Sequence, residues 1–113
     1  MNPSQDALDG PMKAGRVKKR RNRLEIISEM LEAAEKGSRR TGIMYRANLS
    51  YELLVHYMSV LRENGLLETP DERTFFPTRK GHKFLKEFGE LRDLQHGFAR
   101  KVLLINKMLD RGR

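Results

Sequence analysis

The sequence predicts a mainly α-helical domain of the α+β class, in which three short helices and a β-hairpin precede one long C-terminal helix. In the first half of the chain, apolar residues recur at three- and four-residue spacings, as on the buried faces of amphipathic helices. Two short apolar runs then flank the turn sequence PDER, which predicts a hairpin. In the last third, apolar residues alternate four and three apart, which predicts a single long helix.

Length and charge indicate one small domain with an anionic partner. The 113 residues are about the length of a single domain. They include 23 Lys and Arg against 15 Asp and Glu, a net charge of +8, which favours nucleic acid first and an anionic membrane surface second. The chain has no cysteine, so we expect neither disulfides nor thiolate metal sites. It also lacks a long apolar run, so we expect a soluble, cytoplasmic protein without a membrane partner.

The first residues divide into a polar tail and a basic arm. Residues 1–15 contain proline and glycine but no hydrophobic period, so we expect a disordered tail. The arm, RVKKRRNR at residues 16–23, is largely basic. It is expected to lie along nucleic-acid phosphates, with a solvated start to the first helix as the alternative. The arm residues expected to contact phosphates are Lys18, Lys19, Arg20 and Arg21.

Two helices are predicted before residue 48. The first begins at about residue 23, and Gly37 is expected to end it in the left-handed conformation. The second is short, and Thr41 is expected to cap its first turn. The residues expected to be buried are Leu24, Ile27, Met30, Leu31 and Ala34 in the first helix and Ile43, Met44 and Ala47 in the second.

The third helix, residues 50–64, is predicted by both of its ends and by its apolar spacing. Ser50 is expected to cap the helix, and Gly65 is expected to end it. Its buried face would consist of Leu53, Leu54, Tyr57, Met58 and Leu61. The opposite face would carry Tyr51, Glu52, Val55, His56, Ser59 and Arg62.

A short hairpin is predicted after this helix. The sequences LLET and TFFPT favour strands, and the tip between them would be a wing at residues 69–75. Pro77 falls at a strand end, where a missing N–H is tolerated. Three helices followed by a hairpin is the element order of a winged helix.

Two stretches of the chain carry a more specific resemblance. TGIMYRANLSYELLVHYMSVLRENGLLE and FFPTRKGHKFL resemble the archaeal winged helix-turn-helix regulators, in particular the small dimeric archaeal chromatin proteins of the Sac-ten-a type. The similarity covers roughly residues 23–94. We therefore expect a winged helix-turn-helix domain with its basic arm at residues 16–79 and a C-terminal coiled-coil dimerisation helix at residues 80–113. The resemblance implies an antiparallel coiled coil with the two winged domains at opposite ends.

The helix-turn-helix assignment predicts the residues that contact DNA. In such proteins the second helix of the motif enters the major groove, and here that recognition helix would be residues 50–64, with the wing on the backbone or in the minor groove. Glu52 would repel phosphate unless it accepts a hydrogen bond from cytosine or pairs with an arginine; a favourable charge in the first helical turn is the alternative. The residues expected to read bases are Ser50, Tyr51, Val55, His56 and Ser59, and those expected to bind phosphates, besides the arm, are Arg39, Arg40, Arg46, Arg73, Arg79 and Lys80.

The last third of the chain carries the seam of a coiled coil. A helix from about residue 78 to 110 would be roughly 45–50 Å long, too long for one small domain to cover, so we expect a homodimer. Gln95 is the one polar seam residue and would help to fix the register. A helix that folds back on its own domain is the alternative, and a break at Gly97 is left open. The expected seam residues are Phe84, Phe88, Leu91, Gln95, Phe98, Val102, Ile105 and Leu109.

The sequence contains no recognisable catalytic or metal-binding pattern. His56, His82 and His96 lack the i, i+4 pairing of a helical metal site, and no glycine-rich phosphate loop is present. We therefore expect no enzyme activity, no cofactor and no small-molecule substrate. The expected protein is a nucleoid-associated homodimer that binds double-stranded DNA and either regulates transcription or organises chromatin. Two alternatives are a winged-helix protein-interaction module without DNA binding and RNA binding through the basic arm.

Overall fold

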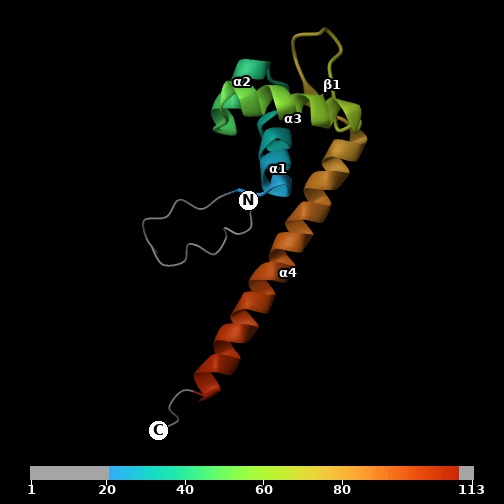
Figure 1. Cartoon of the computed structure of the whole chain (residues 1–113). Coiled ribbons are helices and arrows are strands. Elements are labelled where there is room, and N and C mark those ends of the chain that lie inside the picture. Colours follow the sequence, from blue (N-terminus) through green and yellow to red (C-terminus); the bar gives the residue numbers. More distant parts are fainter. Residues whose placement is uncertain (1–20, 110–113) are drawn as a thin grey trace.

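The computed structural model describes residues 21–109 of the chain. The tail at residues 1–15 and three of the predicted contacts, Lys18, Lys19 and Arg20, lie outside this range. The mainly α-helical fold with a small hairpin and a long C-terminal helix is confirmed (Figure 1). In chain order the elements are α1 (Arg23–Ala33), α2 (Arg40–Arg46), α3 (Tyr51–Glu63), β1 (Leu67–Glu68), β2 (Phe76–Pro77) and α4 (Arg79–Leu109).

Helix α1 begins with a capping box that was not predicted. The Asn22 side chain accepts a hydrogen bond from the Glu25 N–H at 2.8 Å, and the Glu25 carboxylate accepts one from the Asn22 N–H at 2.9 Å. The helix packs against both α2 and α4, so two adjacent residues, Ile26 and Ile27, are buried. The expected burial of Leu24 is wrong, because this residue lies outside both contact faces and is exposed.

Helix α2 begins two residues earlier than a cap at Thr41 would place it, so the assignment of Thr41 as its cap is wrong. Arg39 occupies the N-cap position with extended backbone and no side-chain capping bond. The reason is a short bridge to the hairpin. The Ser38 N–H donates to the Phe75 carbonyl at 3.1 Å, and the Phe75 N–H donates to the Ser38 carbonyl at 2.8 Å. This bridge holds the chain extended through residue 38, and the helix follows at once.

A tight turn joins α2 to α3. Asn48 adopts a left-handed conformation, with φ of 53°, which asparagine tolerates better than most residues. Ser50 caps α3 as predicted, because its hydroxyl oxygen accepts a hydrogen bond from the Leu53 N–H at 3.1 Å. The buried stripe of α3 is narrower than predicted: Leu54, Met58 and Leu61 are buried, whereas Leu53 lies at the edge of this stripe and is 40% exposed.

The hairpin is short and antiparallel, with Leu67 opposite Pro77 and Glu68 opposite Phe76. Both strands lie within the predicted runs but contain two residues each. In the turn between them, the Asp71 carboxylate accepts hydrogen bonds from the N–H groups of Thr74 and Arg73 at 2.7 and 2.9 Å. These two bonds hold the pKa of Asp71 below its ordinary value of 3.8.

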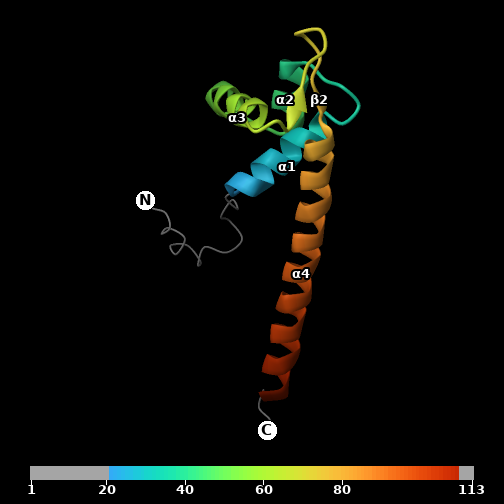
Figure 2. The same ribbon diagram turned by 90° about the vertical axis from the view of Figure 1, so that its right-hand side faces the viewer.

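Helix α4 extends far beyond the rest of the fold in both views (Figures 1 and 2). It contains 31 residues and continues through Gly97 without a break. Its first turns pack against α1 and β2, while the described part of the chain measures 66 × 27 × 20 Å. The Cα radius of gyration is 18.0 Å, well above the roughly 13 Å of a compact domain of about 100 residues. The helix therefore does not fold back on its own domain.

Candidate nucleic-acid interface

The outer face of α3 is open to solvent. Tyr51, in the first turn, is 70% exposed, and Val55, His56 and Ser59 are also exposed. Two of the predicted base-reading hydroxyl groups already form bonds within the helix: Ser50 caps it, and the Ser59 hydroxyl donates to the Glu63 carboxylate at 3.1 Å. Both hydroxyl groups are thus already engaged in bonds within the helix. Tyr51, Val55 and His56 are therefore the predicted base-reading side chains that stay available.

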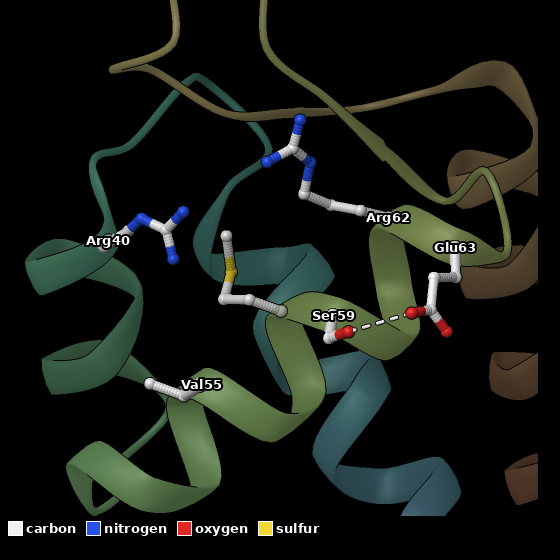
Figure 3. Close-up of a pocket in the computed structure, with 6 residues that line it drawn as sticks. Arg40, Val55, Ser59, Arg62 and Glu63 are labelled. Carbon is white, nitrogen blue, oxygen red and sulfur yellow. Dashed lines mark hydrogen bonds between the residues drawn. The ribbon is translucent and has the colours of Figure 1, made fainter.

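A hollow of about 450 Å³ lies beside this face, and we call it the α2–α3 hollow (Figure 3). Two arginine side chains converge on it, Arg40 from the first turn of α2 and Arg62 from the last turn of α3. Both guanidinium groups also lie over the ring of Phe75, at 5.3 and 5.6 Å from its centre. The residues that line the hollow are Arg40, Val55, Met58, Ser59, Arg62 and Glu63.

A second hollow, of about 290 Å³, lies between α2 and the wing, and we call it the wing hollow. It brings Arg73 of the wing together with Arg39 and Arg40, and all three are predicted phosphate contacts, although Arg73 is far from the other two in the sequence. Glu72, the one carboxylate in its lining, belongs to the wing turn and has a positive φ of 63°. The start of α2 and the wing therefore present one cationic surface next to α3.

Three other predicted phosphate contacts bind main-chain carbonyl groups. The Arg21 guanidinium donates to the carbonyls of Ala47 and Asn48 at 2.6 and 2.8 Å, and it also pairs with Glu29. Arg46 donates to the Ala33 carbonyl at 2.8 Å, and Lys80 donates to the Asn64 carbonyl at 2.9 Å. These side chains therefore stabilise the ends of helices, and their contact with phosphate stays a prediction. Arg79, at the start of α4, is exposed.

Sequence reasoning did not assign a role to Arg62 or Phe75. The helical period correctly placed Arg62 on the exposed face of α3, but nothing in the sequence linked it to Arg40. That link depends on Phe75, which is 1% exposed and enters the core from the hairpin. A buried aromatic residue at the base of the wing thus brings the two arginines together.

The predicted seam of α4 has two parts. Phe84 and Phe88 stack with 6.3 Å between ring centres and are covered by the chain's own domain, partly for Phe84 and almost fully for Phe88. From residue 91 onwards the seam is exposed, and Phe98 and Leu109 are 72% and 75% exposed. The exposed seam residues are Leu91, Gln95, Phe98, Val102, Ile105 and Leu109.

The described part of the chain offers no candidate for a metal site or a membrane-spanning helix. Within residues 21–109, no three His, Cys, Asp or Glu side chains are grouped as a metal site would require. None of the helices in this range combines the length and the apolar character needed to cross a membrane. In each of the two hollows, the arginines outnumber the single lining carboxylate.

A family model described as winged helix-turn-helix matches residues 20–96. This match covers most of the chain, so the protein belongs to the winged helix-turn-helix family. Among solved structures, its fold is similar to that of Sso10a-2, a DNA-binding protein from Sulfolobus solfataricus, with a TM-score of 0.70 and 22% sequence identity. The similarity covers 79% of this chain and 97% of that one, and the expected resemblance to archaeal winged helix-turn-helix proteins is confirmed. None of the curated proteins compared with the chain matches it.

Proposed function

We propose that this protein is a homodimer that binds double-stranded DNA, with α3 in the major groove and the wing on the backbone or in the minor groove. The observation that carries the proposal is the open face of α3 beside a cationic surface made by Arg39, Arg40 and Arg73. Membership of the winged helix-turn-helix family and the fold shared with a DNA-binding protein support it. Its role would be to regulate transcription or to organise chromatin.

In this proposal the contacts divide into two sets. Tyr51, Val55 and His56 reach base edges, because they project from the first turns of the recognition helix. Arg39 and Arg73 hold backbone phosphates on the side of the wing, where they fix the position of α3 without reading sequence. The Lys and Arg residues of the arm, in the winged domain at residues 16–79, add further phosphate contacts.

The DNA-binding proposal is tested by fluorescence anisotropy of a labelled mixed-sequence duplex at several salt concentrations. We expect the logarithm of the affinity to fall linearly with the logarithm of the salt concentration, because bound cations displace counterions from phosphate. The Arg39→Ala variant should bind all sequences more weakly by a similar factor. The Tyr51→Ala/His56→Ala variant should instead lose discrimination between sequences. A wild-type protein that does not bind at low salt would refute the proposal.

The exposed part of α4 supports homodimerisation through residues 80–113. The apolar seam residues from Leu91 to Leu109 are all exposed to solvent, and such a stripe is stabilised by a second helix. An antiparallel partner would be centred near residue 100, because only then does every exposed seam residue meet another. Leu91 would face Leu109, Gln95 would face Ile105, and Phe98 would face Val102 of the other chain. The two winged domains would lie at opposite ends.

Cysteine cross-linking tests this arrangement, and the chain has no native cysteine to interfere. If the helices are antiparallel, Phe98→Cys and Val102→Cys variants should each stay uncross-linked alone. They should form a disulfide-linked heterodimer when mixed, because a disulfide requires Cα atoms within about 7 Å. Self-cross-linking of each variant alone would indicate parallel helices, and a monomer by sedimentation would refute the dimer.

A protein-docking role is the second candidate, and one observation favours it. Tyr51 and Val55, one helical turn apart, form an exposed, partly apolar group at the start of α3, and such groups can bind a partner protein. This role predicts a complex that survives high salt and needs these two residues. DNA binding predicts the opposite dependence on salt, so the anisotropy experiment separates the two.

A further inference from the structure

Two arginine side chains from different helices converge on one open hollow. Arg40 and Arg62 both line the α2–α3 hollow (Figure 3), and both guanidinium groups lie within 6 Å of the centre of the same Phe75 ring. The ring belongs to the core, so it is a fixed surface. Stacking on an aromatic face restricts a guanidinium group and leaves its N–H edge free to donate. The two cations are thus positioned before any ligand arrives.

The charges in the hollow favour an anion. Among residues 21–109, the ion pairs join Arg21 to Glu29 and Lys86 to Glu90, and neither Arg40 nor Arg62 takes part in them. Glu63 is the one carboxylate that lines the hollow, and it already accepts a hydrogen bond from the Ser59 hydroxyl. Two guanidinium groups against one carboxylate leave a net positive charge that a singly charged anion would neutralise.

We propose that Arg40 and Arg62 together hold one phosphate of the DNA backbone in the α2–α3 hollow, with Phe75 positioning both guanidinium groups. A phosphodiester suits the site because its oxygens accept from two planar guanidinium groups at once. The hollow lies beside α3 and adjoins the wing hollow, which shares Arg40. The sugar-phosphate backbone that borders the major groove occupied by α3 would pass over the α2–α3 hollow. The inference rests on the DNA-binding function proposed above and adds Arg62 and Phe75 to it.

The test measures how many phosphates the pair neutralises. Arg40→Met and Arg62→Met keep an unbranched apolar chain against Phe75 but remove the charge. Each variant and the double variant are titrated with a fluorescein-labelled mixed-sequence duplex at several salt concentrations. If both arginines share one phosphate, the negative slope of log affinity against log salt should become shallower by about 0.9 in the double variant. Two separate phosphates would change the slope by about 1.8, which would overturn the inference.

Control measurements distinguish failure of this inference from failure of the proposed function. Arg100→Met removes a charge from the exposed, C-terminal half of α4 and should leave the slope unchanged. Thermal unfolding of every variant identifies a loss of folding. A wild-type protein that does not bind the duplex refutes DNA binding itself. A wild-type protein that binds, with an unchanged slope in the double variant, refutes only the phosphate site.

A third substitution separates phosphate from base recognition. Glu63→Gln removes the carboxylate from the hollow, so it should tighten binding to all sequences by roughly twofold to threefold if a phosphate lies there. If the hollow instead holds a base pair, with Glu63 accepting from cytosine N4, the same substitution should weaken binding and relax sequence preference. That result would overturn the phosphate site.

Discussion

The two halves of α4 carry the same kind of apolar pattern but have different surroundings. In the first half, residues 79–90, Gly81 and Phe88 are buried against the winged domain. In the second half, residues 91–109, no described residue is buried, and large apolar side chains such as Phe98 are mostly in solvent. A regular apolar period thus predicts a helix face that needs a packing partner, whereas the tertiary structure determines which partner covers each part of that face.

The glycines of α4 show the same contrast. A Cβ atom at Gly81 would lie 2.4 Å from the Leu66 carbonyl oxygen and 3.2 Å from the Cβ of Pro77. Around Gly89 and Gly97, by contrast, a Cβ atom would meet nothing within 4 Å. Gly81 therefore permits the close approach of α4 to the hairpin, whereas the other two only weaken the helix.

The largest expected effect comes from a charge on the exposed half of the seam. Val102→Glu should raise the dimer dissociation constant at least about 100-fold, because each chain would bury an unpaired carboxylate. Sedimentation equilibrium measures this change. Leu103→Glu is the control, since the neighbouring Leu103 is also exposed, at 65% against 41% for Val102, but lies off the seam. Equal effects of both substitutions would contradict the assigned seam.

The second largest effect is expected from substituting the packed Gly81 and the exposed Gly97 of α4. Gly81→Ala should lower the free energy of unfolding by about 1–3 kcal/mol, because its methyl group overlaps a carbonyl oxygen that belongs to the backbone. Gly97→Ala should raise it by up to about 1 kcal/mol through helix propensity. Urea denaturation at fixed protein concentration measures both. Stabilisation by Gly81→Ala would show that α4 does not approach the hairpin so closely.

Gln95 provides a third and smaller effect within the exposed half. Gln95→Leu should tighten the dimer by roughly fivefold, or about 1 kcal/mol, because it replaces a polar seam residue by an apolar one. It should leave the antiparallel orientation in place, because Gln95 faces Ile105 in that arrangement and only a parallel pair would bring two Gln95 amides together. Self-cross-linking of Phe98→Cys in the Gln95→Leu background would contradict this pairing.

The smallest expected effect is on the turn of the wing, which belongs to the domain that covers the first half of α4. Because two N–H donors lower the pKa of Asp71, its carboxylate stabilises the wing turn above the ordinary pKa of 3.8. That contribution disappears as the pH falls through the lower pKa of the folded state. The protection factor of the Thr74 amide, which is the exchange rate of an unprotected amide relative to its own at the same pH, should therefore fall in acid. In Asp71→Asn this change with pH should be absent, and an identical acid response in both proteins would contradict the role of Asp71.

Much of the local structure was predictable because it depends on neighbouring residues. The cap at Ser50, the left-handed Gly37 and Gly65 after their helices, and the four-and-three spacing of α4 are all properties of short stretches. The errors occurred where distant segments meet. Thr41 does not cap α2 because the hairpin binds residue 38 and sets the start of the helix, and Leu53 is exposed because the elements packed on α3 cover a narrow stripe.

The candidate interface divides in the same way. The sequence identified the exposed face of α3 and the arginines near it, because amphipathic spacing and composition are visible in one dimension. It did not distinguish Arg46, which binds the Ala33 carbonyl, from Arg40, which faces a hollow. Both are arginines of one short helix, and only their tertiary neighbours differ.

The order and type of the elements, the basic character of the chain and the apolar seam of α4 can all be read from the sequence. Each of these depends on local backbone preference or on the sum of the side chains. Which part of the seam is covered, and which basic side chains donate to main-chain carbonyl groups, became clear only from the packed structure. It also decided that Arg40 and Arg62 meet over Phe75. These features depend on contacts between residues far apart in the chain, and such contacts form only when the helices and the hairpin pack together.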